Sequence, residues 1–131
     1  MIRRNTKQRQ AVLEVIQKND KHFTADEVYA CIHQKDARVS RGTVYRNLQI
    51  LTEENQIRRI RMPNMSDRYE WNMKDHDHLL CRECGKLIDV GPIRSGADQM
   101  VTKMSDYADI HHVFLFSGIC PECQKKAAKR K

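Results

Sequence analysis

The chain has 131 residues, enough for one or two small domains, and a hydrophobic content of 40% allows only a modest core. Its N-terminus lacks an apolar signal segment, and no run of residues is long enough to span a bilayer. We therefore expect a cytoplasmic protein without a membrane partner. The net charge of +7 is uneven: residues 1–72 carry 14 Lys/Arg against 9 Asp/Glu, whereas residues 73–131 carry 10 against 8. The first part is expected to approach a polyanion.

Three helical patterns follow one another in residues 5–54. The first covers residues 5–19, with Asn5 or Thr6 as its cap. The second follows the sequence Thr24-Ala-Asp-Glu27, a capping box in which the threonine hydroxyl and the glutamate carboxylate each accept a backbone N–H. The third begins after Ser40, a good N-cap, and runs to about residue 54.

The third helix carries the candidates for nucleic-acid contacts. Its buried side is predicted to consist of Val44, Leu48 and Leu51. Basic, amide and aromatic side chains on the exposed side of the last of three short helices are typical of a recognition helix in a major groove. An ordinary solvated helix face is the alternative. The candidates are Arg41, Tyr45, Arg46 and Gln49.

A basic hairpin comes next. Residues 56–62 and 67–71 alternate as strands do, and a Pro-Asn turn separates them. The hairpin presents Arg58, Arg59, Arg61 and Arg68. Three helices followed by a hairpin predict a winged helix-turn-helix, in which wing arginines such as Arg58 and Arg59 would contact DNA phosphates or the minor groove.

Two Cys-x-x-Cys pairs predict a structural zinc site. Cys81 and Cys84 form the first pair, and Cys120 and Cys123 form the second. Gly85 stands where the first turn needs a positive φ. Two alternatives are a pair of disulfides and a site that joins the first cysteine pair to two nearby histidines. The fifth cysteine, Cys31, is interpreted as a packing residue on the second helix.

The second half of the chain is predicted to be a dimerisation domain. Residues 78–81 and 86–90 form strands around the zinc turn, and apolar residues keep helical spacing between 93 and 108, with Met100 and Met104 as core residues. Residues 109–117 are expected to form a strand that includes His111 and His112. This strand has apolar residues on both faces, so a second subunit would cover one of them.

The predicted fold class is therefore α+β. Its parts are a winged helix-turn-helix DNA-binding domain over 1–72, a hinge over 73–78, a small α/β dimerisation domain with structural zinc over 79–124, and a basic tail over 125–131.

A second cluster of possible ligands lies beside the zinc motif. His76 and His78 are two residues apart, so in an extended segment they point to the same side. Glu70 precedes them and Asp89 follows them. Imidazoles with carboxylates are harder ligands than thiolates, and they suit Fe²⁺, Mn²⁺, Zn²⁺ or Ni²⁺. The residues predict a closed structural site and an adjustable regulatory one.

Three stretches together resemble the ferric uptake regulator (Fur) family of metal-dependent bacterial transcription factors. They are Thr43-Val-Tyr-Arg-Asn-Leu48, the run from Asp75 to Asp89, and Cys120-Pro-Glu-Cys123. The resemblance implies a winged helix hinged to a dimerisation domain that zinc on four cysteines holds together. It implies that regulatory Fe²⁺ or Mn²⁺, or Zn²⁺ in vitro, binds to ligands from both domains and the hinge. These are His22, Glu70, His76, His78 and Asp89.

The resemblance also bears on two finer points. The peroxide-sensing branch, PerR, has aspartates at the positions of Glu70 and Asp89, and iron-sensing Fur has glutamates at both, so this chain has one of each. Many Fur proteins have a third metal site, which would include Asp77 and His112. At that site Asp75 stands where a histidine is usual, and Gly96 where a glutamate is usual.

The expected function is that of a homodimeric, metal-dependent repressor that binds a double-stranded operator and is not an enzyme. One alternative is a peroxide sensor, in which iron catalyses oxidation of ligand histidines. Another is a hydrolytic or redox enzyme, which the four thiolates disfavour because they leave the zinc no open position. A third is a zinc-stabilised interaction module without DNA binding.

Overall fold

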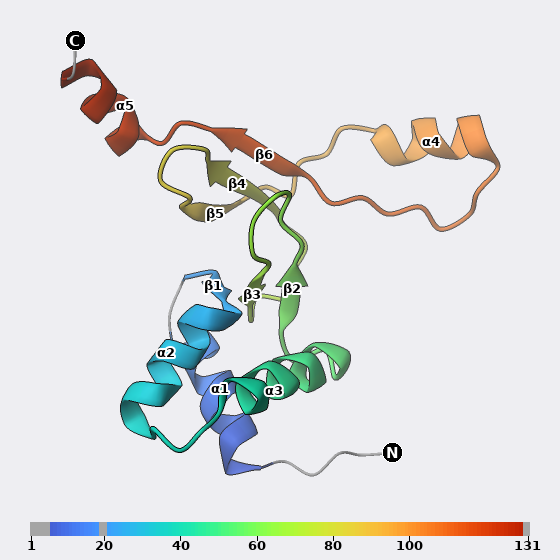
Figure 1. Ribbon diagram of the computed structural model, residues 1–131. Helices are drawn as coiled ribbons and strands as arrows, with labels where there is room; N and C mark the ends of the chain where they lie inside the picture. The colour runs from blue at the N-terminus through green and yellow to red at the C-terminus, as the bar shows by residue number, and fades with distance from the viewer. Residues whose placement is uncertain (1–5, 19–20, 130–131) are drawn as a thin grey trace. The chain divides into compact units, whose positions relative to one another are not determined.

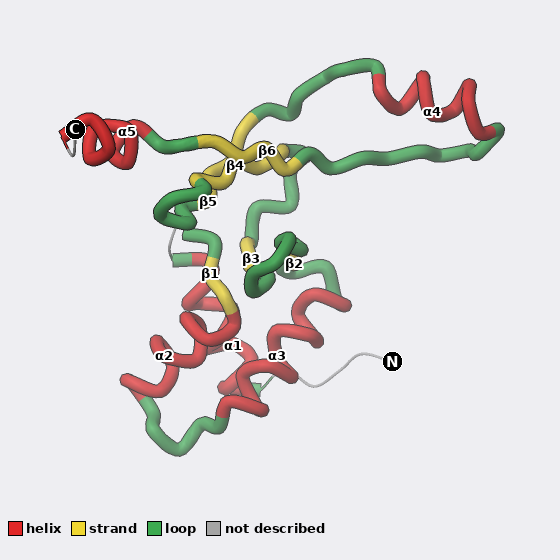
Figure 2. Tube along the Cα trace, turned by 45° about the horizontal axis from the view of Figure 1, so that its top comes forward, coloured by secondary structure: helices red, strands yellow, loops and turns green. Residues whose placement is uncertain are grey.

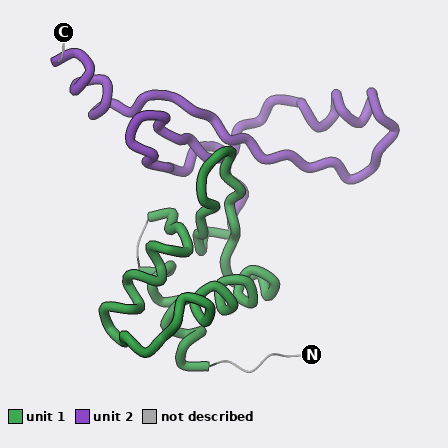
Figure 3. The backbone as a smooth tube through the Cα atoms, in the orientation of Figure 1, with its two compact units in different colours: residues 1–73 green, residues 74–131 purple. Residues whose placement is uncertain are grey.

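The computed structural model describes residues 6–18 and 21–129, and the chain divides into two compact units, residues 1–73 and 74–131 (Figure 3). Within the described ranges, no helix is both long and apolar enough to cross a membrane. The possible cap Asn5 and the last two residues of the expected basic tail lie outside the described residues.

The first unit is built on three helices, α1 (Lys7–Gln17), α2 (Ala25–Lys35) and α3 (Arg41–Glu53), as the sequence predicted (Figure 1). Their apolar faces meet in one core. Its most deeply buried side chains are Val12, Ile16, Val28, Val44 and Leu48, each at most 1% exposed. Burial of these side chains, rather than helix propensity, accounts for most of the stability of such short helices.

Side-chain caps set where the three helices begin. The Thr6 hydroxyl accepts the Arg9 N–H, and Ser40 accepts the Thr43 N–H at 3.1 Å. At α2 the capping box is complete: Thr24 Oγ1 accepts the Glu27 N–H at 3.1 Å, and Glu27 Oε1 accepts the Thr24 N–H at 2.9 Å. The caps that the sequence indicated at Thr24 and Ser40 are therefore confirmed.

A small antiparallel sheet completes the first unit. Its strands are β1 (Phe23–Thr24), β2 (Arg58–Ile60) and β3 (Arg68–Glu70), in the order β1-β3-β2. The hairpin β2–β3, called the wing below together with its turn, was predicted, but β1 was not. In β1, Phe23 pairs with Tyr69. Three helices and this sheet form a winged helix-turn-helix.

The second unit contains a three-stranded mixed sheet and two helices (Figure 2). Strand β4 (Asp77–Cys81) lies in the middle, antiparallel to β5 (Leu87–Val90) and parallel to β6 (Leu115–Gly118). Helix α4 (Ala97–Ser105) separates β5 from β6, and α5 (Pro121–Lys129) follows β6. The expected basic tail therefore begins inside a helix.

The predicted strand over 109–117 is wrong over most of its length, because β6 begins only at Leu115. Asp109 has a φ of 54°, a left-handed conformation that an extended strand does not contain. His111 and His112 consequently lie in an irregular segment, and both are exposed. The run of apolar residues correctly marked the end of this strand but not its start.

The expectation that Met100 and Met104 are core residues is also wrong for the single chain. Helix α4 has no buried residue, and these methionines are 63% and 82% exposed. Figures 1 and 2 show α4 at the tip of a long excursion, away from the sheet of its own unit. Helical spacing identified an apolar face correctly, but spacing carries no information about which molecule covers that face.

Candidate functional site

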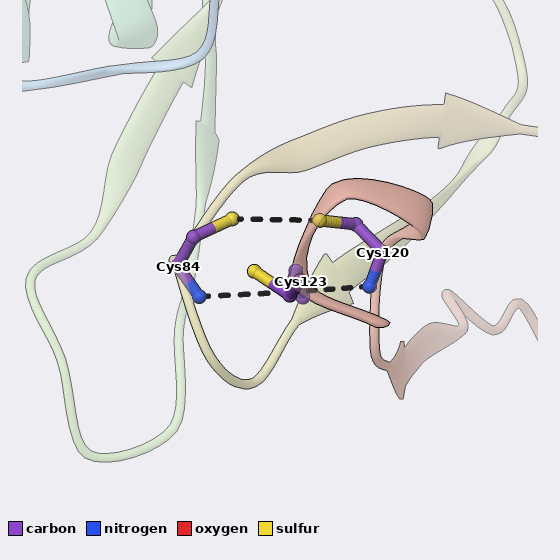
Figure 4. A group of neighbouring side chains, drawn as sticks. Cys84, Cys120 and Cys123 are labelled. Carbon is purple, nitrogen blue, oxygen red and sulfur yellow. Dashed lines mark hydrogen bonds between the residues drawn. The ribbon is translucent and has the colours of Figure 1, made fainter. Parts of the chain in front are cut away.

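The second unit brings all four cysteines of the two Cys-x-x-Cys pairs together. Their sulfur atoms lie within 4.8 Å of one another. Figure 4 shows the sulfur atoms of Cys84 and Cys120 facing one another. The distance between them is 3.8 Å, far longer than a disulfide bond of about 2.05 Å. All four are free thiols, so the disulfide alternative finds no support, and the cluster does not include a histidine.

The backbone conformation and backbone hydrogen bonds around this cluster favour the binding of a cation. Gly85 has the positive φ expected for the turn, at 78°. Cys81 Sγ accepts the N–H of Cys120 at 3.3 Å and that of Cys84 at 3.5 Å, which lowers the pKa of the Cys81 thiol to about 6. Hydrogen bonding to the Cys120 thiol raises the pKa of Cys123 to about 12. Four thiolates can coexist only around a positive ion, so this donor set fits tetrahedral zinc.

A second group of ligand atoms converges at the start of the same sheet. His76 Nε2 lies 3.1 Å from His78 Nε2, and Asp89 Oδ1 lies 3.4 Å from both. The antiparallel pairing of β4 and β5 places His78 directly opposite Asp89. The side chains of His76 and His78 are 5% and 2% exposed, whereas that of Asp89 is 38% exposed, so the imidazoles are buried and the carboxylate is open to water.

The orientation of His76 suits a metal ligand. Its Nδ1–H donates to the carbonyl oxygen of Lys74 at 2.6 Å. This hydrogen bond selects the tautomer in which Nε2 carries a lone pair, and Nε2 is the atom that faces His78 and Asp89. Two imidazole nitrogens and one carboxylate oxygen can supply three of the ligands that a divalent metal ion needs.

The first unit contributes a separate pair. His22 Nε2 lies 3.0 Å from Glu70 Oε2, and the side chains are 6% and 4% exposed. The pairing of β1 with β3 brings them together, since His22 precedes β1 and Glu70 ends β3. Arg58 also approaches this carboxylate, with Nη1 3.8 Å from Glu70 Oε1, and Arg58 Nη2 donates to the Met73 carbonyl at 3.0 Å.

The two residues implied for a third metal site have other partners. The buried Asp77 carboxylate accepts the N–H groups of Ile93 at 2.9 Å and Phe114 at 3.0 Å, and these bonds hold the pKa of Asp77 below its ordinary value. It thereby ties β4 to the segments on either side of α4. His112 Nδ1 lies 2.5 Å from Asp98 Oδ1, a residue that the sequence did not single out.

Four of the six predicted DNA-contacting residues line one groove of the first unit, between α3 and the wing, and Arg41 and Arg46 do not. The lining of the groove includes Tyr45, Gln49, Arg58 and Arg59. Arg41, Tyr45, Arg46 and Gln49 are all exposed on α3. Arg59 lies on the surface of the wing and pairs with Asp67 at 2.7 Å, whereas Arg58 turns towards Glu70.

A winged helix that carries arginines on α3 and the wing, joined to a unit that gathers four cysteines and a histidine–carboxylate group, defines a metal-binding transcriptional regulator. The family model of the Ferric uptake regulator family matches residues 2–116, and the chain belongs to this family. It is accordingly a metal-responsive, DNA-binding repressor that acts as a homodimer, and it is not an enzyme.

Relatives within the family carry more than one name. The peroxide-responsive repressor PerR of Staphylococcus aureus is 32% identical over 124 residues, which cover 94% of this chain and 84% of that protein. The solved structure of the Helicobacter pylori ferric uptake regulator Fur, described as having three functional metal binding sites, is 34% identical with a TM-score of 0.78, covering 92% of this chain and 82% of that one. The Campylobacter jejuni peroxide stress regulator is 25% identical with a TM-score of 0.68, covering 88% of each chain. Peroxide sensing stays an alternative prediction.

Proposed function

We propose that one regulatory divalent ion, Fe²⁺ or Mn²⁺, controls repression by binding to ligands from both units. The ligands would be His22, Glu70, His76, His78 and Asp89. The observation that carries this proposal is the convergence of His76 Nε2, His78 Nε2 and Asp89 Oδ1 within 3.4 Å of one another. A group of donors this compact, with two buried imidazoles and one tautomer preset by the Lys74 carbonyl, favours a cation.

The pair from the first unit supplies the link to DNA binding. His22 lies directly before β1, and Glu70 is the last residue of β3 in the wing. A bound ion supplies positive charge that favours the carboxylates and the neutral imidazoles as ligands. Ligands from both units would restrain the winged helix relative to the dimerisation unit, which shifts the population towards a DNA-binding arrangement. Typical couplings correspond to an affinity change of roughly 5- to 150-fold.

The remaining parts have assigned roles in this proposal. Zn²⁺ on Cys81, Cys84, Cys120 and Cys123 would hold the second unit together. Tyr45, Arg46 and Gln49 would contact base edges, and Arg41, Arg58 and Arg59 mainly phosphates. A homodimer would place two such faces on a pseudo-palindromic operator. The proposed location is the cytoplasm, where DNA is accessible and four thiols stay reduced.

For a third site we propose no role, although the Helicobacter pylori relative is described with three functional metal binding sites. Both oxygens of Asp77 accept backbone N–H groups. Withdrawing this carboxylate to bind an ion would leave two amides without their acceptor, which costs about 1–3 kcal/mol for each buried group.

The test measures metal content and DNA affinity on the same samples, before and after mild chelation. We expect one zinc per chain to survive, a second metal to be lost, and affinity for DNA to fall with it. His76→Ala should abolish the metal response, whereas His111→Ala is the matched control, because His111 is exposed and pairs with the exposed Asp109. If DNA affinity were the same with and without the labile metal, the proposed ligand set would play no regulatory part.

A further inference from the structure

Carboxylates of the first unit hold most of the side chains that are predicted to contact DNA. Asp26 binds both Arg41 and Tyr45. Glu53 Oε1 accepts from Gln49 Nε2 at 3.2 Å, and Asp67 Oδ2 accepts from Arg59 Nε at 2.8 Å. Within the described part of the chain, Arg46 has no ion-pair partner. The DNA-facing surface is therefore largely neutralised from within the unit.

Asp26 is distinctive among these carboxylates because one oxygen serves two groups on another helix. It lies in the first turn of α2, and its Oδ1 accepts from Arg41 Nη1 and from the Tyr45 hydroxyl. Arg41 and Tyr45 are one turn apart on α3, so their side chains share a face. The Arg41 guanidinium also lies 4.7 Å above the ring of Tyr29, which limits its directions further.

This contact is exposed enough to be exchanged. The side chains of Arg41 and Asp26 are 56% and 63% exposed, so water and salt screen the pair. An exposed ion pair contributes little to folding, and a DNA phosphate can replace the carboxylate at small cost.

We infer that Asp26 is a positioning residue that determines DNA specificity: its carboxylate occupies Arg41 in the free protein and presets Tyr45 for base contact. The inference rests on the proposed DNA contacts of α3. Binding to random DNA depends almost wholly on phosphate contacts. An acidic group beside Arg41 weakens these contacts, both by competing for the guanidinium and by repelling the phosphates.

Binding to a selected site responds differently. Holding the Tyr45 hydroxyl restricts the side chain before DNA arrives, so less rotamer freedom is lost when the base contact forms. This saving offsets part of the electrostatic cost of Asp26 in the complex with a specific site, but not in the complex with random DNA. Asp26 should therefore widen the ratio between the two affinities.

The experiment compares wild type with Asp26→Asn in the metal-loaded dimer, by fluorescence anisotropy over a series of salt concentrations. The specific probe is a duplex enriched from a random-sequence pool by the wild-type protein, and the second probe is a scrambled duplex of the same composition. For Asp26→Asn we expect affinity for the scrambled duplex to rise about 3- to 10-fold, with a salt slope steeper by about one phosphate contact. The ratio of specific to scrambled affinity should fall by a similar factor.

Asp36→Asn is the matched control, because it removes the same charge from the same unit. Asp36 pairs with Arg38, which is 92% exposed and is not among the predicted DNA contacts. An equal rise with Asp36→Asn, or an unchanged specificity ratio with Asp26→Asn, would overturn the inference. Those results leave the proposed function intact. If the DNA affinity of the wild type did not change when the labile metal was removed, the proposed function itself would be wrong.

Discussion

The His22 imidazole and the Glu70 carboxylate lie 3.0 Å apart in the first unit, and both side chains are at least nine-tenths buried. Such a pair of titratable groups is costly to bury unless each has a partner. The short strand β1 makes the arrangement possible, because its pairing with β3 aligns the segment after His22 with the end of the wing. This pair is the basis of the first prediction.

His22→Ala should lower the affinity of the regulatory site for Mn²⁺ by at least about 10- to 100-fold, because the site would lose a nitrogen donor. Isothermal titration of Mn²⁺ into protein that retains only its zinc measures this change. His33→Ala is the control, since His33 lies on the exposed face of α2 and shares a 3.3 Å hydrogen bond with the Tyr29 hydroxyl. Equal Mn²⁺ affinity in wild type and His22→Ala would remove His22 from the ligand set.

Cys84→Ser should release the structural zinc and unfold the second unit. Structural zinc contributes folding free energy directly, and three thiolates with a hydroxyl form a much weaker site. Zinc content per chain, with far-UV circular dichroism, measures the outcome. Cys31→Ser is the matched control: Cys31 is half-buried beside the helical core of the first unit, so zinc content should stay at about one ion per chain. Retention of that zinc in Cys84→Ser would disprove the four-cysteine site.

The Asp67 carboxylate should make the stability of the wing depend on pH in the acid range. Its carboxylate accepts the Met62 N–H at 2.9 Å and pairs with Arg59, and the Met62 bond is the larger cause of its lowered pKa. Because the folded-state pKa lies below the ordinary value of about 3.9, the stabilisation is complete above that value and is lost as pH falls through the folded-state pKa.

At pH 7, Asp67→Asn should therefore be about 1 kcal/mol less stable than wild type, and the difference should shrink as the pH falls below about 4. Urea unfolding followed by the fluorescence of Trp71, the single tryptophan, reports on the end of the wing. Other carboxylates titrate in both proteins and cancel in the comparison. A difference that grew towards low pH would contradict the assigned sign.

Met104→Glu should dissociate the dimer. Met104 is 82% exposed in the single chain, on a helix without any buried residue, so the variant chain should keep its fold while an apolar contact between subunits is lost. Sedimentation velocity at micromolar concentration should show a monomer. Lys103→Glu introduces the same acid on the neighbouring position of α4 and should stay dimeric. A dimeric Met104→Glu protein would place the interface elsewhere.

The local architecture follows from the amino-acid sequence alone, because the signals that set it act between residues close in the chain. The capping box at Thr24 and the N-cap at Ser40 each join groups three residues apart, and the wing joins neighbouring strands. The two Cys-x-x-Cys turns are similarly self-contained. Helix starts, the hairpin and the candidate zinc ligands could thus be predicted from spacing and residue type.

Which distant groups meet depends instead on how the helices and strands pack. Spacing gave no reason to select His22, which entered through the family resemblance; in the fold, β1 brings it to Glu70. The contact of Asp26 with Arg41 and Tyr45 depends on how α2 packs against α3. Conversely, α4 has an apolar face that its own unit does not cover. Periodicity defines the faces of an element, whereas packing between elements far apart in sequence decides what each face contacts.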